Sequence, residues 1–231
     1  MITGSDVNHI KNVLRMRPGE EICVSDGTDK KEYRCRIEEL GMEEIRCSLC
    51  FIKESDIELS SRVFLFQGLP KADKMEWIVQ KAVELGVYAV IPVACKRSVV
   101  KLDDKKEKSK RIRWNTIAES AAKQSKRKII PEVLPVMTMK EAVQKAAECE
   151  IRMIPYELAK DMADTKQIFD HLEPDKDIAV FIGPEGGFAE EEIQLAIEYD
   201  VVPITLGKRI LRTETAGLTV LSWIMYQLEQ D

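Results

Sequence analysis

An unbroken apolar run that leads into a glycine-rich turn stands at residues 178–188: Ile178-Ala179-Val180-Phe181-Ile182-Gly183-Pro184-Glu185-Gly186-Gly187-Phe188. The apolar part, 178–182, has the length and composition of a β-strand. Three acidic residues, Glu190, Glu191 and Glu192, follow the turn, and acidic side chains favour the first turn of a helix. The stretch therefore predicts a strand, a turn and a helix in succession.

The same succession recurs along the chain from residue 63 onward. Strand-like runs alternate there with longer helical stretches. The strand-like runs are 63–67, 87–93, 151–155, 178–182 and 201–206. Between the first two runs, apolar residues at helical spacing predict an amphipathic helix: Met75, Ile78, Val79, Ala82 and Val83. Asp73 with Glu76 is a start signal for this helix, and Gly86 is a stop signal. The alternation predicts an α/β fold with a mostly parallel sheet.

The last predicted helix, 213–228, differs from the others because apolar residues cover most of its circumference. They are Leu218, Val220, Leu221, Trp223, Ile224, Met225 and Leu228. A helix of this kind requires burial on all sides, by the core and by a second subunit. We therefore expect a homodimer.

The N-terminal part of the chain predicts one short helix followed by several short strands. Residues 6–15 carry apolar side chains at helical spacing, and Arg17-Pro18-Gly19 ends this predicted helix. From 21 to 66, short β-branched and apolar runs are separated by turn signals such as Asp26-Gly27, which predicts a small β-barrel. We expect two domains, 1–66 and 67–231.

Composition places the chain among ordinary globular proteins. Its 231 residues are 45% hydrophobic and 32% charged. No apolar run approaches the roughly 20 residues that cross a bilayer, and the first residues lack the features of a secretory signal. We expect a cytoplasmic protein that has no membrane association and six reduced cysteines. Cys47 and Cys50 form one C-x-x-C, but no second pair accompanies it, so we expect no metal.

A basic block lies within this chain, although its net charge is −5. Residues 96–128 hold thirteen Lys or Arg against four Asp or Glu, a local charge of +9 that leaves −14 on the rest of the chain. Such a block is either a solvated helix face or a surface that binds nucleic acid.

The glycine-rich turn 183–188 is either a tight connection or a ligand-binding loop. Ligands in open α/β sheets bind at the carboxyl ends of the strands, where this turn lies. Dinucleotide and P-loop fingerprints are absent from the chain, and Glu185 would repel phosphate. A carboxylate suits a ligand with positive charge, and S-adenosylmethionine carries a sulfonium and an ammonium group.

A second loop leads from the last strand into the last helix: Leu206-Gly207-Lys208-Arg209-Ile210-Leu211-Arg212-Thr213-Glu214-Thr215-Ala216-Gly217. Thr213 and Glu214 suit a helix start, as a cap and as an acidic residue at the positive end. Capping does not account for Arg209 and Arg212.

Together the two loops resemble the paired signature of the RsmE family of SPOUT RNA methyltransferases, G-P-E-G-G-F followed by L-G-K-R-I-L-R-T-E-T-A. Further segments resemble family patterns: His9 with Arg15-Met16-Arg17-Pro18-Gly19, Leu69-Pro70-Lys71 through Lys74, Gln80-Lys81, Glu84-Leu85-Gly86, and Gln124-Ser125 with Arg127. The resemblance spans nearly the whole chain. The sequence departs from the family at its start, where a strand before Ile2 is usual, and at Ala189, where Ser or Thr is usual.

The resemblance implies an N-terminal PUA-like β-barrel and a C-terminal SPOUT domain with a trefoil knot. It implies a homodimer that methylates N3 of a uridine in 16S ribosomal RNA, in helix 44 of the small subunit. The implied S-adenosylmethionine-binding residues are Pro155, Tyr156, Glu157, Gly183, Pro184, Glu185, Gly186, Gly187, Leu206, Gly207, Arg209, Ile210 and Leu211. The implied RNA-binding residues are His9, Arg15, Arg17, Lys71, Lys74, Lys123, Gln124 and Arg127.

Methylation at N3 requires that the uracil lose its N3 proton, so we expect a carboxylate that accepts it and a guanidinium that stabilises the anion. The candidates are Glu185 or Glu214 as the base, and Arg209 or Arg212 as the stabilising group. Two alternatives remain: another SPOUT methylation, such as that of the ribose 2′-oxygen, and a non-catalytic RNA-binding protein of ribosome assembly.

Overall fold

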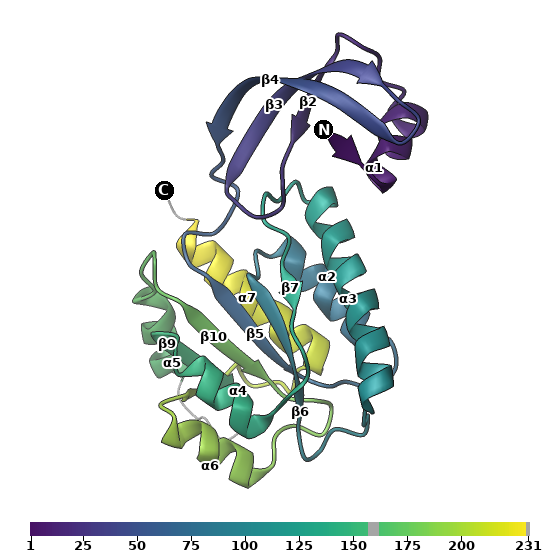
Figure 1. Ribbon diagram of the computed structural model, residues 1–231. Helices are drawn as coiled ribbons and strands as arrows, with labels where there is room; N and C mark the ends of the chain where they lie inside the picture. The colour runs from purple at the N-terminus through teal and green to yellow at the C-terminus, as the bar shows by residue number, and fades with distance from the viewer. Residues whose placement is uncertain (157–161, 230–231) are drawn as a thin grey trace. The chain divides into compact units, whose positions relative to one another are not determined.

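The computed structural model describes residues 1–156 and 162–229, which form two compact units. The N-terminal unit comprises Met1–Glu58 together with Arg127–Ile129, and the C-terminal unit comprises Leu59–Lys126 and the chain from Ile130 onward (Figure 1). The division falls after Glu58, earlier than the predicted boundary after residue 66. The reason is that β5 (Val63–Gly68) pairs with two strands of the C-terminal sheet and so belongs to it.

The N-terminal unit is built on an antiparallel sheet in the order β1-β4-β3-β2. Its strands are β1 (Ile2–Thr3), β2 (Glu21–Val24), β3 (Lys31–Leu40) and β4 (Glu44–Glu54). The sheet confirms the β-rich interpretation of this part. The predicted helix 6–15 is instead a short helix α1 (Ser5–Asn8) that continues as a π-helix η1 (His9–Val13). Only Val7 and Ile10 of its apolar residues are buried, and they pack with Ile37 and Ile45.

The C-terminal unit holds a parallel sheet in the order β11-β9-β10-β5-β6-β7, with β8 also paired to β6. Its remaining strands are β6 (Ala89–Ala94), β7 (Glu132–Val133), β8 (Met137–Thr138), β9 (Ile151–Pro155), β10 (Ile178–Ile182) and β11 (Val202–Ile204). Its helices are α2 (Lys74–Glu84), α3 (Asp104–Gln124), α4 (Met139–Ala146), α5 (Met162–Asp170), α6 (Glu190–Glu198) and α7 (Thr213–Leu228). The α/β fold and its parallel sheet are confirmed.

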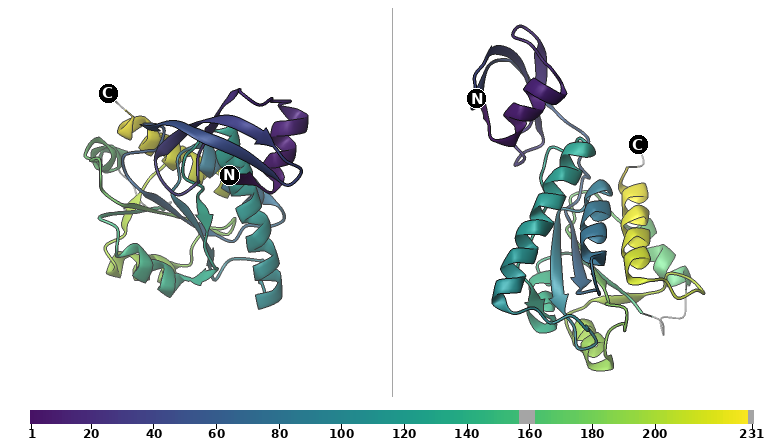
Figure 2. Two further views of the ribbon diagram at one scale, coloured as in Figure 1. Left: turned by 45° about the horizontal axis from the view of Figure 1, so that its top comes forward. Right: turned by 90° about the vertical axis from the view of Figure 1, so that its right-hand side faces the viewer.

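Helices cover both faces of this sheet, and successive side chains of β10 point alternately toward the helices of one face and those of the other. Ile178, Val180 and Ile182 face a core shared with α2, α3, α5 and α7. Ala179 and Phe181 face the opposite core, shared with α4 and α6. The right-hand view of Figure 2 shows α2, α3 and α7 side by side on the first of these faces. Because β10 is buried on both faces, its sequence is a continuous apolar run.

The last helix has the predicted bounds and is not buried all round. Gly217, Val220, Leu221 and Ile224 lie in the core, whereas Tyr226 keeps 70% of its surface exposed. The other apolar residues of α7 are partly buried. Among the described residues, no helix is both long enough and apolar enough to span a bilayer.

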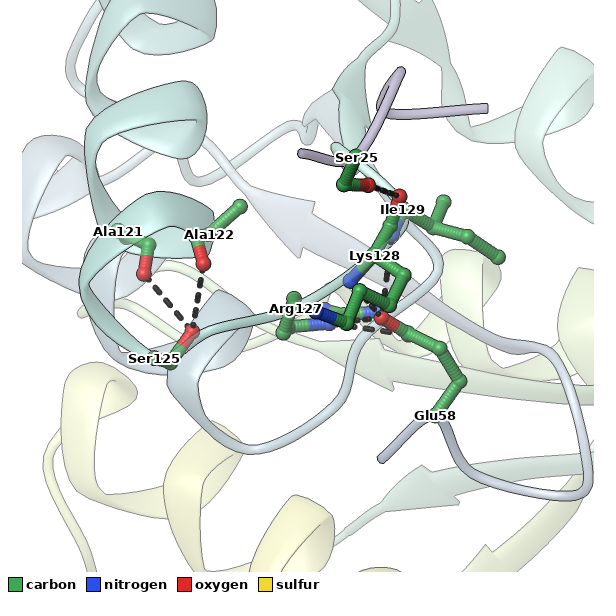
Figure 3. A network of polar contacts seen from close by, with 8 residues as sticks. All are labelled: Ser25, Glu58, Ala121, Ala122, Ser125, Arg127, Lys128 and Ile129. Carbon is green, nitrogen blue, oxygen red and sulfur yellow. Dashed lines mark hydrogen bonds and ion pairs between the residues drawn. The ribbon is translucent and has the colours of Figure 1, made fainter. Parts of the chain in front are cut away.

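The segment Arg127–Ile129 is bound into the N-terminal unit by one carboxylate (Figure 3). Glu58 accepts hydrogen bonds from the Arg127 guanidinium, at 2.5 Å from Nη2 and 3.1 Å from Nε, and from the backbone N–H of Lys128 at 2.8 Å. The side chains of Glu58 and Arg127 are only 3% and 5% exposed. Lys128 is held similarly, through an ion pair with Glu32 at 3.2 Å.

This burial changes the interpretation of the basic block. Arg127, which was assigned to RNA, has its guanidinium enclosed and paired with Glu58, so it cannot bind a phosphate without breaking that pair. Its neighbour Lys128 is also buried and paired. Both residues therefore stabilise the N-terminal unit.

We predict that Arg127→Gln destabilises the protein by about 3–5 kcal/mol, because it leaves the Glu58 carboxylate buried without its cation. Urea unfolding of the full chain measures this. Lys126→Gln is the matched control, since it removes the same charge from an exposed neighbouring residue. Equal unfolding free energies for the two variants would contradict the role of the pair.

Candidate functional site

Two loops of interest follow parallel strands of one sheet and therefore lie at the same edge of that sheet. Residues 183–188 follow β10 and residues 205–212 follow β11, and β9 lies between these two strands. Tyr156, which follows β9, donates a backbone hydrogen bond to the carbonyl of Ile204 at 2.9 Å. This edge is where ligands bind in open α/β sheets. We call 183–188 the glycine loop and 205–212 the arginine loop.

The glycine loop lies against the end of β5 with no room for a side chain between them. A Cβ atom on Gly68 would lie 2.5 Å from Pro184 Cδ and 2.6 Å from Pro184 N. Within the loop, the N–H of Gly187 donates to the carbonyl of Pro184 at 2.9 Å, and Gly187 has a φ of 67°. Glycine is needed at position 187 because other residues rarely adopt a positive φ.

A buried polar relay joins β5, the glycine loop and the start of α7. Gln67 donates through Nε2 to the hydroxyl of Thr213 at 2.9 Å, and that hydroxyl donates to the carbonyl of Gly183 at 2.6 Å. The predicted capping role of Thr213 is therefore wrong. Thr213 is the first helical residue, and Arg212 occupies the N-cap without a side-chain hydrogen bond. The hydroxyl of Thr213 ties α7 to the glycine loop.

One ammonium group lies between the two acidic residues that were candidates for the base. Lys74 Nζ is 2.9 Å from Glu185 Oε1 and 3.3 Å from Glu214 Oε2. Glu185 also accepts from the backbone N–H of Lys71, at 3.1 Å and 3.3 Å. The three side chains are 18% to 31% exposed. The cluster connects the start of α2 to the glycine loop and to α7.

The electrostatics of this cluster favour its charged state. Burial alone would raise the pKa of Glu185, but the hydrogen bonds from Lys74 and from backbone N–H groups outweigh burial and lower it. The hydrogen bond to Glu185 raises the pKa of Lys74, although burial opposes this. A carboxyl group with a lowered pKa is a weak proton acceptor. Glu185 is therefore better suited to holding the loop than to acting as the base.

The arginine loop presents cations and free backbone donors. Arg209 and Arg212 are exposed, and their side chains have no partner among residues 1–156 and 162–229. In the same described part of the chain, the backbone N–H groups of Leu206 and Leu211 donate to no other residue. Ile210 is 91% exposed. The loop thus offers hydrogen-bond donors, an apolar side chain and two guanidinium groups to a ligand.

The structure brings together most of the predicted cofactor residues, because they lie at the ends of β9, β10 and β11 and in the loops that follow. Glu157 lies outside the described residues. Lys71 and Lys74 are at the same edge, where Lys74 is held by two carboxylates. His9, Arg15 and Arg17 belong to the N-terminal unit and are exposed there. Lys123 and Gln124 end α3, where Lys123 pairs with Glu119 at 3.0 Å.

Sequence reasoning missed Gln67 and Gly68. Both are buried at the end of β5, within the stretch Val63-Phe64-Leu65-Phe66-Gln67-Gly68. The available signal was an amide and a glycine directly after an apolar strand, since a buried polar group requires a partner. That partner, Thr213, is remote in sequence.

Comparisons with known proteins find relatives over nearly the whole chain. A family model for an RNA methyltransferase domain matches residues 58–225, and a model for an RNA methyltransferase PUA domain matches residues 2–50. The chain is 41% identical to the ribosomal RNA small subunit methyltransferase E of Bacillus subtilis, over 99% of this chain and 90% of the relative.

A solved structure is also similar over nearly its whole length. It is the ribosomal RNA small subunit methyltransferase E of Neisseria gonorrhoeae bound to S-adenosyl methionine. The identity is 35% and the TM-score is 0.81, and the match covers 96% of this chain and 88% of the other.

We predict that Lys74→Gln lowers the unfolding free energy at neutral pH, because two carboxylates lose their shared cation. Since the pKa of Glu185 is lowered in the folded state, its contribution is present above the ordinary carboxyl value of 4.5 and is lost as the pH falls through the lowered value. The difference between wild type and Lys74→Gln should therefore be largest near neutral pH and shrink below about pH 4.5.

Chemical unfolding at several pH values measures this difference. Lys71→Gln is the matched control, because Lys71 contacts Glu185 only through its backbone N–H. Lys74→Arg should retain most of the stability. The same pH dependence in Lys71→Gln and Lys74→Gln would show that the ammonium of Lys74 has no special role.

Proposed function

The chain belongs to the ribosomal RNA small subunit methyltransferase E family, and on that premise we propose that it methylates N3 of a uridine in 16S ribosomal RNA with S-adenosylmethionine. The observation that carries the proposal is the convergence of the glycine loop and the arginine loop at one sheet edge. The relay from Gln67 through Thr213 to Gly183 supports it by fixing that arrangement. A target in helix 44 of the small subunit and a trefoil knot around the loops are parts of the proposal that rest on the family resemblance.

The chemistry of the two loops fits S-adenosylmethionine. In the glycine loop, Gly186 lies close against Arg97, because a Cβ on Gly186 would lie 3.1 Å from Arg97 Cβ and 3.3 Å from its carbonyl oxygen. The free N–H groups of Leu206 and Leu211 suit the acceptor nitrogens of an adenine ring, and Ile210 offers apolar surface. Glu185 and Glu214 supply negative charge opposite the ligand's cationic groups. When bound, S-adenosylmethionine supplies an electrophilic methyl group.

The protein's own task is to present uracil N3 as an anion. Arg212 lies at the start of α7 with an exposed guanidinium that is unpaired among the described residues. A guanidinium there can stabilise the charge that spreads onto the uracil oxygens, an effect of about 10²-fold or more. Arg209, exposed in the same loop, is the second candidate for this role.

Glu214 is the better candidate for the group that accepts the N3 proton. Lys74 holds only one of its carboxylate oxygens, and the other has no partner within the described parts of the chain. Glu185, by contrast, binds Lys74 and the backbone of Lys71, and its pKa is lowered. We therefore assign Glu185 to positioning and Glu214 to proton transfer.

Methylation of the ribose 2′-oxygen is the second candidate function, because it would use the same cofactor loops. Small ribosomal subunits and naked 16S RNA from a strain that lacks the gene should each be incubated with the protein and S-adenosylmethionine. We expect 3-methyluridine after nucleoside digestion and chromatography with mass spectrometry. A 2′-O-methylated nucleoside would replace the proposal with the alternative, and no methylated product would overturn both.

Two variants in this assay separate binding from chemistry. Arg212→Ala should keep cofactor affinity and lower kcat by about 10²-fold or more. Gly186→Val should lose cofactor affinity, because its side chain would clash with Arg97 and displace the glycine loop. Isothermal titration gives the affinities. If Arg212→Ala loses affinity and keeps its turnover at saturation, Arg212 belongs to the cofactor pocket.

We also propose that the protein acts as a homodimer. Tyr226 on α7 is 70% exposed, and Trp223, Met225 and Leu228 are only partly buried. Light scattering at micromolar concentration should give twice the chain mass, and Tyr226→Glu should weaken the association. A stable wild-type monomer would contradict the proposed dimer.

A further inference from the structure

The thirteen cations of the basic block fall into two groups in the structure. One group is engaged: Lys96 pairs with Glu191, Arg97 donates to the carbonyl of Gly186, Lys106 pairs with Asp103, Arg113 with Glu76, Lys123 with Glu119, Arg127 with Glu58 and Lys128 with Glu32. The side chains of the other group have no partner among the described residues. They are Lys101, Lys105, Lys108, Lys110, Arg111 and Lys126.

The free cations concentrate around the first half of α3. Lys105, Lys108 and Arg111 are spaced by three residues, so each follows the previous one by about one helical turn. Lys101 lies three residues before the first helical residue, Asp104. On α3, Trp114 and Ala118 are buried, and the helix packs on α2 (Figure 2, right-hand view). We call Lys101, Lys105, Lys108 and Arg111 the cationic stripe.

The acidic residues nearby do not neutralise the stripe. Asp103 caps α3 by accepting from the backbone N–H of Lys106 at 2.8 Å. Glu107 accepts from the backbone N–H of Val136 at 3.0 Å. Asp104 lies in the first turn, where it favours the positive end of the helix. These carboxylates are used to start the helix and to anchor a loop.

The stripe contributes little to the stability of the fold. Its four side chains have no hydrogen bond or ion pair with another residue of the described chain. If the stripe were only a solvated helix face, replacing its residues with Gln would have no effect on function. The charge arrangement therefore points to a polyanionic partner.

We propose that the cationic stripe binds the phosphate backbone of the RNA substrate, away from the reacting uridine. The inference rests on the proposed function and adds a contact surface to it. Cations that have no carboxylate partner among the described residues suit phosphates, and such contacts carry no base specificity. Ile112, 69% exposed and four residues after Lys108, lies beside the stripe and can pack on a ribose.

The proposal relocates the main RNA contact predicted for the basic block. The predicted residues Lys123, Gln124 and Arg127 lie at the far end of α3 and beyond it, where Lys123 and Arg127 are paired with carboxylates. The free charge lies instead in 101–111. A phosphate at Lys123 would have to displace Glu119, whereas one at Lys105 or Lys108 displaces only water.

The test compares two triple variants of the full chain with equal charge changes on one helix. The stripe variant is Lys105→Gln, Lys108→Gln and Arg111→Gln. The control variant is Lys106→Gln, Arg113→Gln and Lys123→Gln, all cations with a carboxylate partner. Gln has nearly the helix propensity of Lys and Arg, so both variants should fold. The stripe variant should melt close to the wild-type temperature, because the side chains that it changes have no partner among the described residues.

Binding of a fluorescently labelled RNA hairpin is measured by anisotropy across a salt series. Each phosphate contact contributes about 0.7 to 0.9 to the slope of log K against log salt, so the stripe variant should lower that slope by about two. The control variant should lower it by less than one. Equal slopes for the two variants, or no change in the stripe variant, would overturn the proposal. Stronger binding of the wild type to polyglutamate than to RNA would assign the stripe to an acidic protein and also overturn it.

Failure of the stripe is distinguishable from failure of the proposed function. The stripe variant should keep its cofactor affinity, because no residue of the stripe lies in the glycine loop or the arginine loop. If wild type yields 3-methyluridine and the two variants bind RNA equally, only the stripe is wrong. If wild type yields no methylated nucleoside and the stripe variant alone loses its salt slope, the proposed function is wrong and the RNA-binding stripe stands.

Discussion

The close approach of Pro184 to Gly68 is the constraint on which the site depends. Because a Cβ on Gly68 would come within 2.6 Å of the Pro184 backbone, the glycine loop can lie directly against β5 only while residue 68 has no side chain. That position lets Thr213 reach the carbonyl of Gly183, and it lets Glu185 reach the backbone of Lys71. The first turn of α7 and the start of α2 are thereby tied to one loop.

Electrostatic pairing then decides which charged groups are available for function. Lys74 is shared by two carboxylates, and Arg127 is enclosed with Glu58, so neither cation is free for RNA. Arg212 and the cations of the cationic stripe are unpaired within the described residues, and all of them except the half-buried Arg111 are exposed. A buried pair is costly to break, whereas an exposed unpaired cation exchanges only water for a phosphate or an anionic base. Burial and pairing therefore decide which charged groups can bind a ligand, and the net charge of the chain does not indicate which groups these are.

Local patterns were sufficient for the elements of the C-terminal unit. The bounds predicted for β9, β10 and α7 agree with the structure, because strong apolar periodicity and clear turn residues delimit each of them. The N-terminal helix was predicted less well. Only Val7 and Ile10 of its apolar residues find a core, so the chain changes to a π-helix at His9, and Arg15 takes a positive φ of 54°. A short apolar pattern with little to pack against does not determine helix length.

The sequence by itself determined the α/β architecture, the β-rich N-terminal part and the two loops that carry the family signature, because periodicity and turn chemistry act over a few residues. Only the tertiary structure decided what individual polar groups do. Gln67 forms a hydrogen bond with Thr213, and Glu58 pairs with Arg127. Lys74 forms ion pairs with both Glu185 and Glu214. Each of these contacts joins residues far apart in the chain, and a side chain's role depends on the partner that folding brings to it.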